Sequence, residues 1–333
     1  MTYLPVSRRS LLAAAMGVAL VASAGAQAQQ KKHDPVTFIS GSTTGTWFPT
    51  AAVIADLTNA HYDGQPISVV PGTGAVGNPL SVGTGKSEIG ISNAPFLVAA
   101  QSGGNELYKQ AFPDIRSVFA GPSTAQHLVM ADDFDINVLK TAKDKKPKLR
   151  VGSGEKGSAN QFSFEVLLAH YGVTFDDIEK WGGVVSRTGS TGAADAYNNR
   201  QLDMVNIFIN HPNAKLAEMM QARPSKLVTL PEDARAALQK KWGFEPHTIP
   251  ANTYPNQAQP VQTLALPLVV FATAKVDEQM IYNMTKSVAE NRDRMVKGQA
   301  AFAEWKPEDM PKGLGVAMHP GAARYYKERG WVK

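Results

Sequence analysis

The sequence contains no cysteine among its 333 residues. This absence excludes disulfides, thiolate metal sites, a cysteine nucleophile and a lipidated cysteine. The chain also lacks the G-x-S-x-G elbow of the α/β-hydrolases. Its seven histidines are scattered, and no two of them have the H-x-x-x-H spacing of a helical zinc site. The sequence therefore predicts no metal site, no cofactor and no catalytic residue, and we expect each histidine to have a structural role.

The N-terminus has the pattern of a secretory signal peptide. Arg8 and Arg9 precede an apolar run from Leu11 to Ala24, and two overlapping Ala-x-Ala cleavage signals end at Ala28. The run is shorter than the roughly 20 residues of a spanning helix, although a retained anchor is the alternative. We expect residues 1–28 to be removed and the mature protein to be periplasmic. Ser7 to Leu12 resembles a twin-arginine signal, and the same segment also fits Sec export.

The sequence also lacks a large excess of positive or negative charge. Loss of Arg8 and Arg9 lowers the formal net charge of +5 by two, to +3. This mild charge predicts neither a nucleic-acid partner nor an anionic membrane surface. The composition, 43% hydrophobic and 19% charged, is typical of a soluble globular protein. The length allows two domains of roughly 150 residues each.

What the chain does contain is a repeated succession of strand, small-residue loop and helix. The first runs from Phe38 to Pro49, where Gly41 and Gly45 permit a tight turn. Thr46 is placed to cap the helix that follows, and Pro49 is tolerated in a first helical turn. A helix N-terminus has free N–H groups and partial positive charge, so this joint suits an anion. An ordinary joint without a ligand is the alternative.

Similar joints follow downstream. A strand at 66–70 leads to the glycine-rich loop 71–77, and a strand at 88–92 ends before Asn93, whose amide can face a ligand or form a turn. The spacing Gly72-x-Gly74-x-x-Gly77 matches a dinucleotide fingerprint, but the motif alone is weak and prolines bracket it. A strand at 149–152 leads to the loop 153–160. A strand at 184–185 leads to the loop 188–192, which opens a helix over 193–199.

The remaining pattern predicts further strands and a connecting segment. Residues 117–120 and 127–130 are expected to form two strands, and the buried strand 204–209 ends at Asn210. Residues 246–260 are rich in Pro, Asn and Gln and predict a loop or linker, before an apolar strand at 264–274. Alternating strands and helices indicate an α/β fold with a mostly parallel or mixed sheet.

In open α/β sheets, ligands bind beyond the carboxyl ends of the strands, so these loops are expected to converge on one small polar ligand. Trp47 can wall the pocket with its indole N–H, or pack in the core. Arg187 is the nearest candidate for a carboxylate clamp, and a surface role is the alternative. The predicted ligand-binding residues are Ser42, Thr43, Thr44, Gly45, Thr46, Trp47, Gly72, Thr73, Gly74, Asn93, Gly157, Ser158, Ala159, Asn160, Arg187 and Asn210.

These motifs also resemble a known family. From Val36 to the C-terminus the chain is similar to the TAXI family of TRAP-transporter solute receptors. The resemblance rests on the loop 41–49 with its aromatic pair and proline, the loop 72–78, the strand entry 85–90 and the loop 152–158. It extends to the segment 249–255 and to the ending 319–326.

The resemblance implies a two-domain, clam-like periplasmic-binding-protein fold of type II with a central cleft. Domain 1 would comprise 33–122 plus 256–333, and domain 2 would comprise 123–255, with crossings near 121–124 and 254–262. The protein would bind a small organic anion, a dicarboxylate or an amino-acid-like solute, and deliver it to the membrane permease of a TRAP transporter. We expect a monomer that is not an enzyme. An exported hydrolase or a ligand-sensing protein on the same fold is the alternative.

Overall fold

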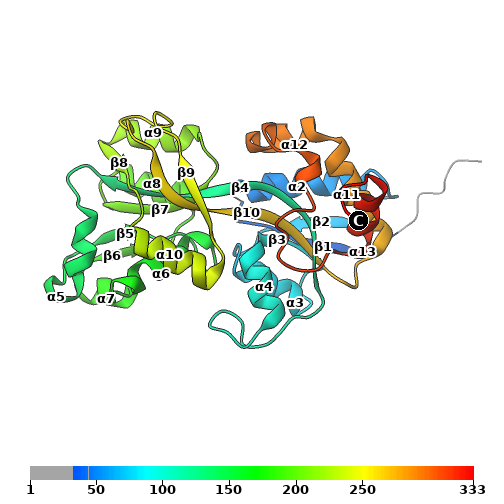
Figure 1. Cartoon of the computed structure of the whole chain (residues 1–333), viewed down its shortest axis with the longest axis horizontal. Coiled ribbons are helices and arrows are strands. Elements are labelled where there is room, and N and C mark those ends of the chain that lie inside the picture. Colours follow the sequence, from blue (N-terminus) through cyan, green and yellow to red (C-terminus); the bar gives the residue numbers. More distant parts are fainter. Residues whose placement is uncertain (1–32, 44) are drawn as a thin grey trace, which may run out of the picture.

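A computed structural model of the protein describes residues 33–43 and 45–333. The predicted signal peptide and Thr44 lie outside the described residues. Two halves, seen left and right in Figure 1, share one mixed sheet with the strand order β2-β1-β3-β10-β4-β7-β5-β6. Strand β8 pairs with β4, and β9 pairs with β10. This is the α/β fold, in two clam-like halves, that the sequence predicts.

The first half contains the parallel strands β1 (Val36–Ile39), β2 (Ile67–Val70) and β3 (Ile89–Asn93). Its helices lie on both faces of the sheet, with α3 and α4 opposite α2, α11 and α12 (Figure 1). Their bounds are α2 (Trp47–Asn59), α3 (Gly77–Gly83), α4 (Ala94–Ser102), α11 (Glu278–Glu290), α12 (Arg292–Gly298), η2 (Ala300–Ala303), η3 (Pro307–Asp309) and α13 (Pro320–Glu328).

The second half is built on β5 (Arg150–Gly152), β6 (Val184–Ser186), β7 (Met204–Ile209), β8 (Ser225–Leu227) and β9 (Glu245–Ile249). Its helices are η1 (Ile136–Thr141), α5 (Ala142–Lys145), α6 (Ala159–His170), α7 (Phe175–Lys180), α8 (Ser190–Asn198), α9 (Ala214–Ala222) and α10 (Glu232–Trp242). Each half has its own apolar core. Phe38, Phe119 and Met284 are fully buried in the first, and Phe164 and Met204 in the second.

Two long antiparallel strands, β4 (Ile115–Ala131) and β10 (Val261–Thr273), run from one half into the other (Figure 1). Val261 to Ala265 of β10 pairs with β9, whereas Leu268 to Ala272 pairs with β3. The partner of β10 therefore changes at Leu266 and Pro267, where the register with β4 is also irregular. We propose that the two halves hinge here and at the facing residues Ser123 and Thr124 of β4. The predicted return crossing, 254–262, lies before this point in the chain.

Three local predictions were wrong. The strands expected at 117–120 and 127–130 are one strand, because β10 pairs with β4 on both sides of Gly121 and Pro122. The expected linker 246–260 begins as strand β9, since β10 offers it an antiparallel partner. Thr46 occupies the position before α2, but its side chain makes no capping hydrogen bond. In each case the tertiary partner or the local backbone overrode the sequence pattern.

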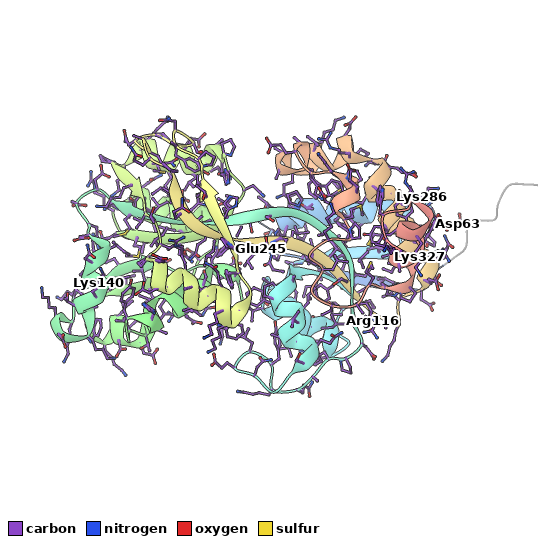
Figure 2. All side chains as sticks on the ribbon, in the orientation of Figure 1. Asp63, Arg116, Lys140, Glu245, Lys286 and Lys327 are labelled. Carbon is purple, nitrogen blue, oxygen red and sulfur yellow. The ribbon has the colours of Figure 1, made fainter. Side chains whose placement is uncertain are left out.

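Charged side chains are spread over the outside of both halves, as the labelled residues in Figure 2 illustrate. Among residues 33–43 and 45–333, no helix combines the length and the apolar character that crossing a membrane requires.

Candidate functional site

The β1–α2 loop forms one wall of a cavity between the halves. The Gly45 N–H donates to the Ser42 carbonyl at 3.0 Å, which closes a tight turn. A Cβ added at Gly41 would lie 3.2 Å from the Cβ of Trp47, so the loop packs closely on this indole. The turn brings Thr46 and Trp47, at the N-terminus of α2, to the cavity. The predicted joint is therefore present, without the expected Thr46 cap.

The β2–α3 loop is held by a buried asparagine that the sequence analysis did not single out. The Asn78 amide donates to the carbonyls of Ser40 at 2.7 Å and Ile91 at 2.8 Å, and accepts from the Gly74 N–H at 3.3 Å. A Cβ at Gly72 would lie 2.4 Å from the Asn78 oxygen, so only glycine fits there. Asn78 thus ties the β2–α3 loop to the residue after β1 and to the middle of β3, which positions Thr73 and Gly74 at the cavity.

Asn93 ends β3 and precedes α4, as its position at the end of a predicted strand indicated. Its side chain is 1% exposed and lines the cavity. The Asn93 Nδ2 donates to the Pro267 carbonyl at 2.8 Å. Its Oδ1 is buried and has no hydrogen-bond partner among the described residues.

The second half contributes the loop between β5 and α6. The Ser158 Oγ caps α6 by accepting from the Gln161 N–H at 3.2 Å. The Asn160 Oδ1 accepts from the Phe208 N–H at 2.9 Å, which holds this loop against β7. The carbonyl of Gly157 accepts from the backbone N–H groups of Val76 at 2.9 Å and Gly77 at 3.3 Å. Loops of the two halves therefore touch directly, and the cleft is closed in this structure.

These loops enclose a cavity of about 110 Å³. This is well below the roughly 300–1,000 Å³ of a pocket for a drug-sized molecule, so the space suits a smaller ligand. Its walls come from both halves. They are Gly41, Ser42, Gly45, Thr46, Trp47, Thr73, Gly74, Ala75, Asn93, Thr124, Glu155, Ser158, Ala159, Asn160, Gly189, Ser190 and Phe208.

Three helix N-termini meet at this cavity. Trp47, Ala159 and Ser190 are the first residues of α2, α6 and α8, helices of 13, 12 and 9 residues, and all three line it. Each helix end carries partial positive charge and free N–H groups. No Lys, Arg or His is among the described lining residues, and Glu155 is their one ionisable side chain. Backbone dipoles, rather than a cationic side chain, thus make the site attractive to an anion.

The structure brings ten of the predicted ligand-binding residues to this cavity. They are Ser42, Gly45, Thr46, Trp47, Thr73, Gly74, Asn93, Ser158, Ala159 and Asn160. Thr43 and Gly72 line a neighbouring hollow of about 620 Å³ that also contains Lys86 and Lys156. Gly157 contacts the opposite loop rather than the cavity. Thr44 lies outside the described residues.

Two predicted residues lie elsewhere in the structure. The Arg187 guanidinium pairs with Glu179 at 2.7 Å and stacks over the Phe175 ring, outside the cavity lining. Asn210 donates to the Ser123 carbonyl at 2.7 Å and accepts from the Gln299 amide at 2.6 Å, so it bridges the halves.

Seven lining residues were absent from the prediction: Gly41, Ala75, Thr124, Glu155, Gly189, Ser190 and Phe208. Gly41, Glu155, Gly189 and Ser190 belong to loops that the sequence marked as strand ends, so including whole loops would have found them. Phe208 and Thr124 lie within strands, where no local signal distinguishes a cavity wall from the core.

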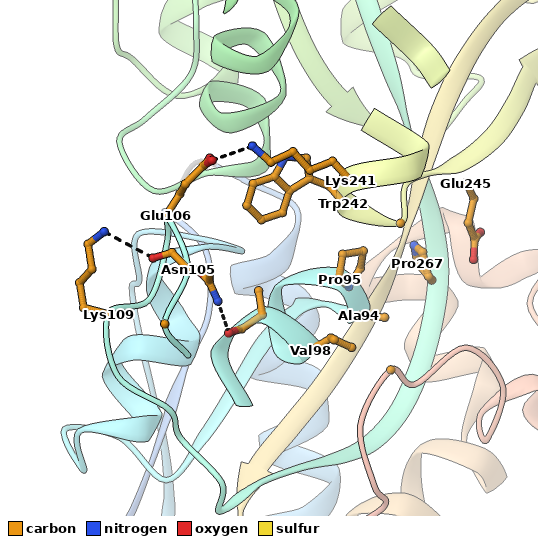
Figure 3. Close-up of a pocket in the computed structure, with 14 residues that line it drawn as sticks. Ala94, Pro95, Val98, Asn105, Glu106, Lys109, Lys241, Trp242, Glu245 and Pro267 are labelled. Atoms are coloured by element: carbon orange, nitrogen blue, oxygen red, sulfur yellow. Dashed lines mark hydrogen bonds and ion pairs between the residues drawn. The ribbon is translucent and has the colours of Figure 1, made fainter. Parts of the chain in front are cut away.

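A larger hollow of about 950 Å³ lies between α4 and the end of α10 (Figure 3). Pro95, Val98, Trp242 and Pro267 line it, and the Lys241–Glu106 ion pair, 2.6 Å long, spans its edge. Among the described residues, α4 is the one helix whose N-terminus opens onto it, and no predicted ligand residue that the structure describes lines it. We therefore place the candidate site in the smaller cavity.

Three histidines gather in the second half, away from the cavity. The His127 ring donates from Nδ1 to the Ala125 carbonyl at 2.8 Å, so its Nε2 accepts from the Tyr254 hydroxyl at 3.1 Å. Burial lowers the pKa of His127 to about 3. The Nε2 atoms of His211 and His247 lie 2.7 Å apart, and burial also lowers both of their pKa values. In the described part of the chain, no group of three or more His, Asp or Glu side chains is arranged to hold a metal ion.

Two α/β halves, two crossing strands and a cavity between the halves define the fold of the periplasmic solute-binding proteins. MatC from Rhodopseudomonas palustris, solved with bound malate, shares this fold. It is 14% identical with a TM-score of 0.55, and the match covers 89% of this chain and 99% of MatC. The chain itself belongs to the NMT1-like family, whose model matches residues 38–330.

Two other solved structures are also similar. The periplasmic binding protein BugD is 14% identical with a TM-score of 0.48, and the match covers 90% of this chain and 99% of BugD. A TctC solute-binding protein from Polaromonas is 14% identical with a TM-score of 0.46, again over 90% of this chain and 99% of the other.

Proposed function

We propose that the protein is an extracytoplasmic receptor for a small organic anion, which it encloses between its two halves. The observation that carries this proposal is the convergence of the N-termini of α2, α6 and α8 on one cavity between the halves. Reversible capture needs many weak donors, which the helix N-termini supply, and a wall that moves, which the proposed hinge would provide. Backbone N–H groups at helix ends bind a carboxylate without a counter-cation.

The site also favours binding over turnover. Ser42, Ser158 and Ser190 line the cavity, but no described histidine lines it to act as their base. The described lining residues include no second carboxylate that would pair with Glu155 in general acid–base catalysis. We therefore propose a receptor rather than the alternative exported hydrolase.

Delivery to a membrane permease belongs to the same proposal. The resemblance of the chain to TAXI receptors supports a TRAP-type permease as the partner and a periplasmic location after cleavage near Ala28. Closure brings the Gly157 carbonyl against the loop of Val76, so a permease can distinguish the loaded from the open form. We further propose that the receptor works as a monomer, because each chain holds both walls of the cavity.

The proposal is tested by a thermal-shift screen of the mature protein, residues 29–333, after unfolding and refolding to remove any copurified ligand. The screen compares dicarboxylates, amino acids, neutral polar solutes and sugars. A ligand at 100 times its dissociation constant should add about 2.7 kcal/mol of stability. A shift with carboxylates, followed by calorimetry that shows stoichiometric binding without turnover, supports the receptor. Shifts confined to neutral solutes would overturn the anion claim, and turnover would favour the enzyme.

A further inference from the structure

The buried amide of Asn93 constrains the ligand beyond its negative charge. Asn93 lines the cavity, and its side chain is 1% exposed. Its Nδ2 is identified as the nitrogen because it lies 2.8 Å from the Pro267 carbonyl, which can only accept. The remaining amide atom, Oδ1, is thus an acceptor. It has no partner among the described residues.

A buried acceptor without a donor is unfavourable, and native structures rarely retain one. The other asparagine oxygens that hold the cavity loops have partners, and the buried Gln126 Oε1, which also lacks one among the described residues, does not line the cavity. The Asn78 oxygen accepts from Gly74, and the Asn160 oxygen accepts from Phe208. Asn93 is the exception, and it is the one of these three at the junction of β3 with the crossing strand β10. The missing donor is therefore expected from the ligand.

The other hydrogen-bonding groups around the cavity indicate which chemical groups the ligand carries. The helix N-termini offer N–H donors, which suit a carboxylate. Asn93 Oδ1 and the Glu155 carboxylate offer acceptors, which a second carboxylate or a carbonyl would face unfavourably. One molecule satisfies both sets only if it carries an anion and a separate O–H or N–H donor.

Resting on the proposed function, we propose that the ligand is a hydroxy- or amino-carboxylate and that Asn93 distinguishes it from the corresponding oxo acid. A hydroxyl or amino group donates to Asn93 Oδ1, whereas an oxo group of nearly equal size places two acceptors against each other. A site built around a buried hydrogen bond discriminates strongly against the analogue that cannot form it. We expect the donor-bearing acid to bind at least about tenfold more tightly.

The hydrogen bond from Asn93 Nδ2 to the Pro267 carbonyl links the discrimination between donor-bearing and oxo acids to the closure of the two halves. Pro267 stands where β10 changes partner from β9 to β3. The crossing strand thus fixes the amide, and a ligand donor on Oδ1 adds a bond on the opposite side of the same side chain. Asn93 is therefore both a binding residue and a contact of the proposed hinge.

The test is calorimetry on the refolded mature protein with three matched pairs: lactate and pyruvate, malate and oxaloacetate, glutamate and 2-oxoglutarate. Within each pair, the ratio of the two dissociation constants measures how much the hydroxyl or amino donor contributes to the affinity. Asn93→Leu removes the acceptor at similar volume and should bring the ratio to near one. Asn59→Leu is the matched control, since Asn59 is also a buried asparagine, donates to the Ile67 carbonyl at 3.0 Å and does not line the cavity.

The two donor types are separated with Glu155→Gln. If Glu155→Gln loses binding of glutamate but not of lactate or malate, the ligand ammonium contacts Glu155. If the ratios of dissociation constants within the pairs are unchanged in Glu155→Gln, a ligand hydroxyl donates to Asn93. Equal affinities within each pair, or tighter binding of the oxo acid, would overturn the inference while carboxylate binding survived. A ratio that persisted in Asn93→Leu would overturn the role of Asn93. If that variant does not fold, the wild-type ratios alone decide, and failure of every carboxylate to bind would overturn the proposed function itself.

Discussion

The backbone N–H of Val76 donates to the carbonyl oxygen of Gly157 at 2.9 Å, and this bond joins the two halves next to the cavity-lining residues Ala75 and Ser158. Beside it, Gly74 has a φ of +103°, and a Cβ there would lie 3.3 Å from the Cα of Ser158. The two loops therefore approach each other backbone to backbone, which side chains would prevent.

Gly74→Ala should consequently weaken ligand binding by about tenfold or more, because the methyl group meets Ser158 only when the halves close. Backbone strain at positive φ should also destabilise the fold by roughly 1–3 kcal/mol. Gly85→Ala is the control for that strain, since Gly85 has a φ of +75° and nothing within 4 Å of the added Cβ. Equal dissociation constants for the two variants, measured by calorimetry, would show that the contact does not limit closure.

Ser158→Asp should abolish anion binding while preserving the fold. Aspartate caps a helix as well as serine does, so α6 keeps its cap. Its charge would lie in the cavity, where two like charges at 4 Å repel by about 4 kcal/mol at an effective dielectric constant of 20. Asn213→Asp is the control, because Asn213 caps α9 through the Leu216 N–H and does not line the cavity. The prediction fails if both variants bind the screened carboxylate with wild-type affinity.

Acid should destabilise the protein through its buried histidines. Burial lowers the pKa of His127 to about 3, against 6.5 in the unfolded chain, so the folded state favours the neutral ring. Its stabilising contribution is present above pH 6.5 and is lost as the pH falls from 6.5 towards 3. The expected slope from this group is about 1.4 kcal/mol per pH unit.

Chemical denaturation at several pH values measures this slope. His127→Phe combined with Tyr254→Phe removes both partners of the 3.1 Å hydrogen bond and should make the stability profile flatter. His211 and His247, whose pKa values burial also lowers, should account for part of the slope that remains. An unchanged slope in the double variant would contradict the assignment to His127.

The Glu106–Lys241 ion pair should make only a small, salt-sensitive contribution to closure. It joins the two halves at 2.6 Å, but its side chains are 68% and 58% exposed. Exposed pairs contribute about 0.2–1 kcal/mol, so Glu106→Gln should weaken ligand binding by a factor of about five at most. Asp309→Asn breaks the Lys312 pair within one half and serves as the control. The ligand affinities of the wild type and Glu106→Gln should differ at low salt and converge at high salt. A weaker affinity of the variant that persisted at high salt would indicate a role of Glu106 other than its charge.

The strand–loop–helix joints were predictable because their signals are local. Gly41, Gly72 and Gly157 mark loops where the backbone turns tightly, and the predicted loops lie at strand ends in the structure. The sequence pattern likewise placed Asn93 at the end of a strand. Short-range steric rules and hydrophobic periodicity are sufficient for such statements.

Other features depended on distant partners. No local pattern indicated that β4 continues through Gly121 and Pro122, since β10 supplies the pairing that keeps it extended. The segment 246–260 has the composition of a linker, yet it begins as β9 for the same reason. The sequence places Arg187 directly before a loop of the site, but in the structure its guanidinium pairs with Glu179.

By itself, the sequence determined that the chain alternates strands and helices, that glycine-rich loops follow several strands, and that no cysteine chemistry operates. Only the tertiary structure decided which loops meet, that three helix ends converge where the described lining residues include no Lys, Arg or His, and that the Asn93 oxygen has no hydrogen-bond partner among the described residues. The physical reason is that backbone conformation is largely set by neighbours in the chain, whereas hydrogen-bond satisfaction is set by neighbours in space.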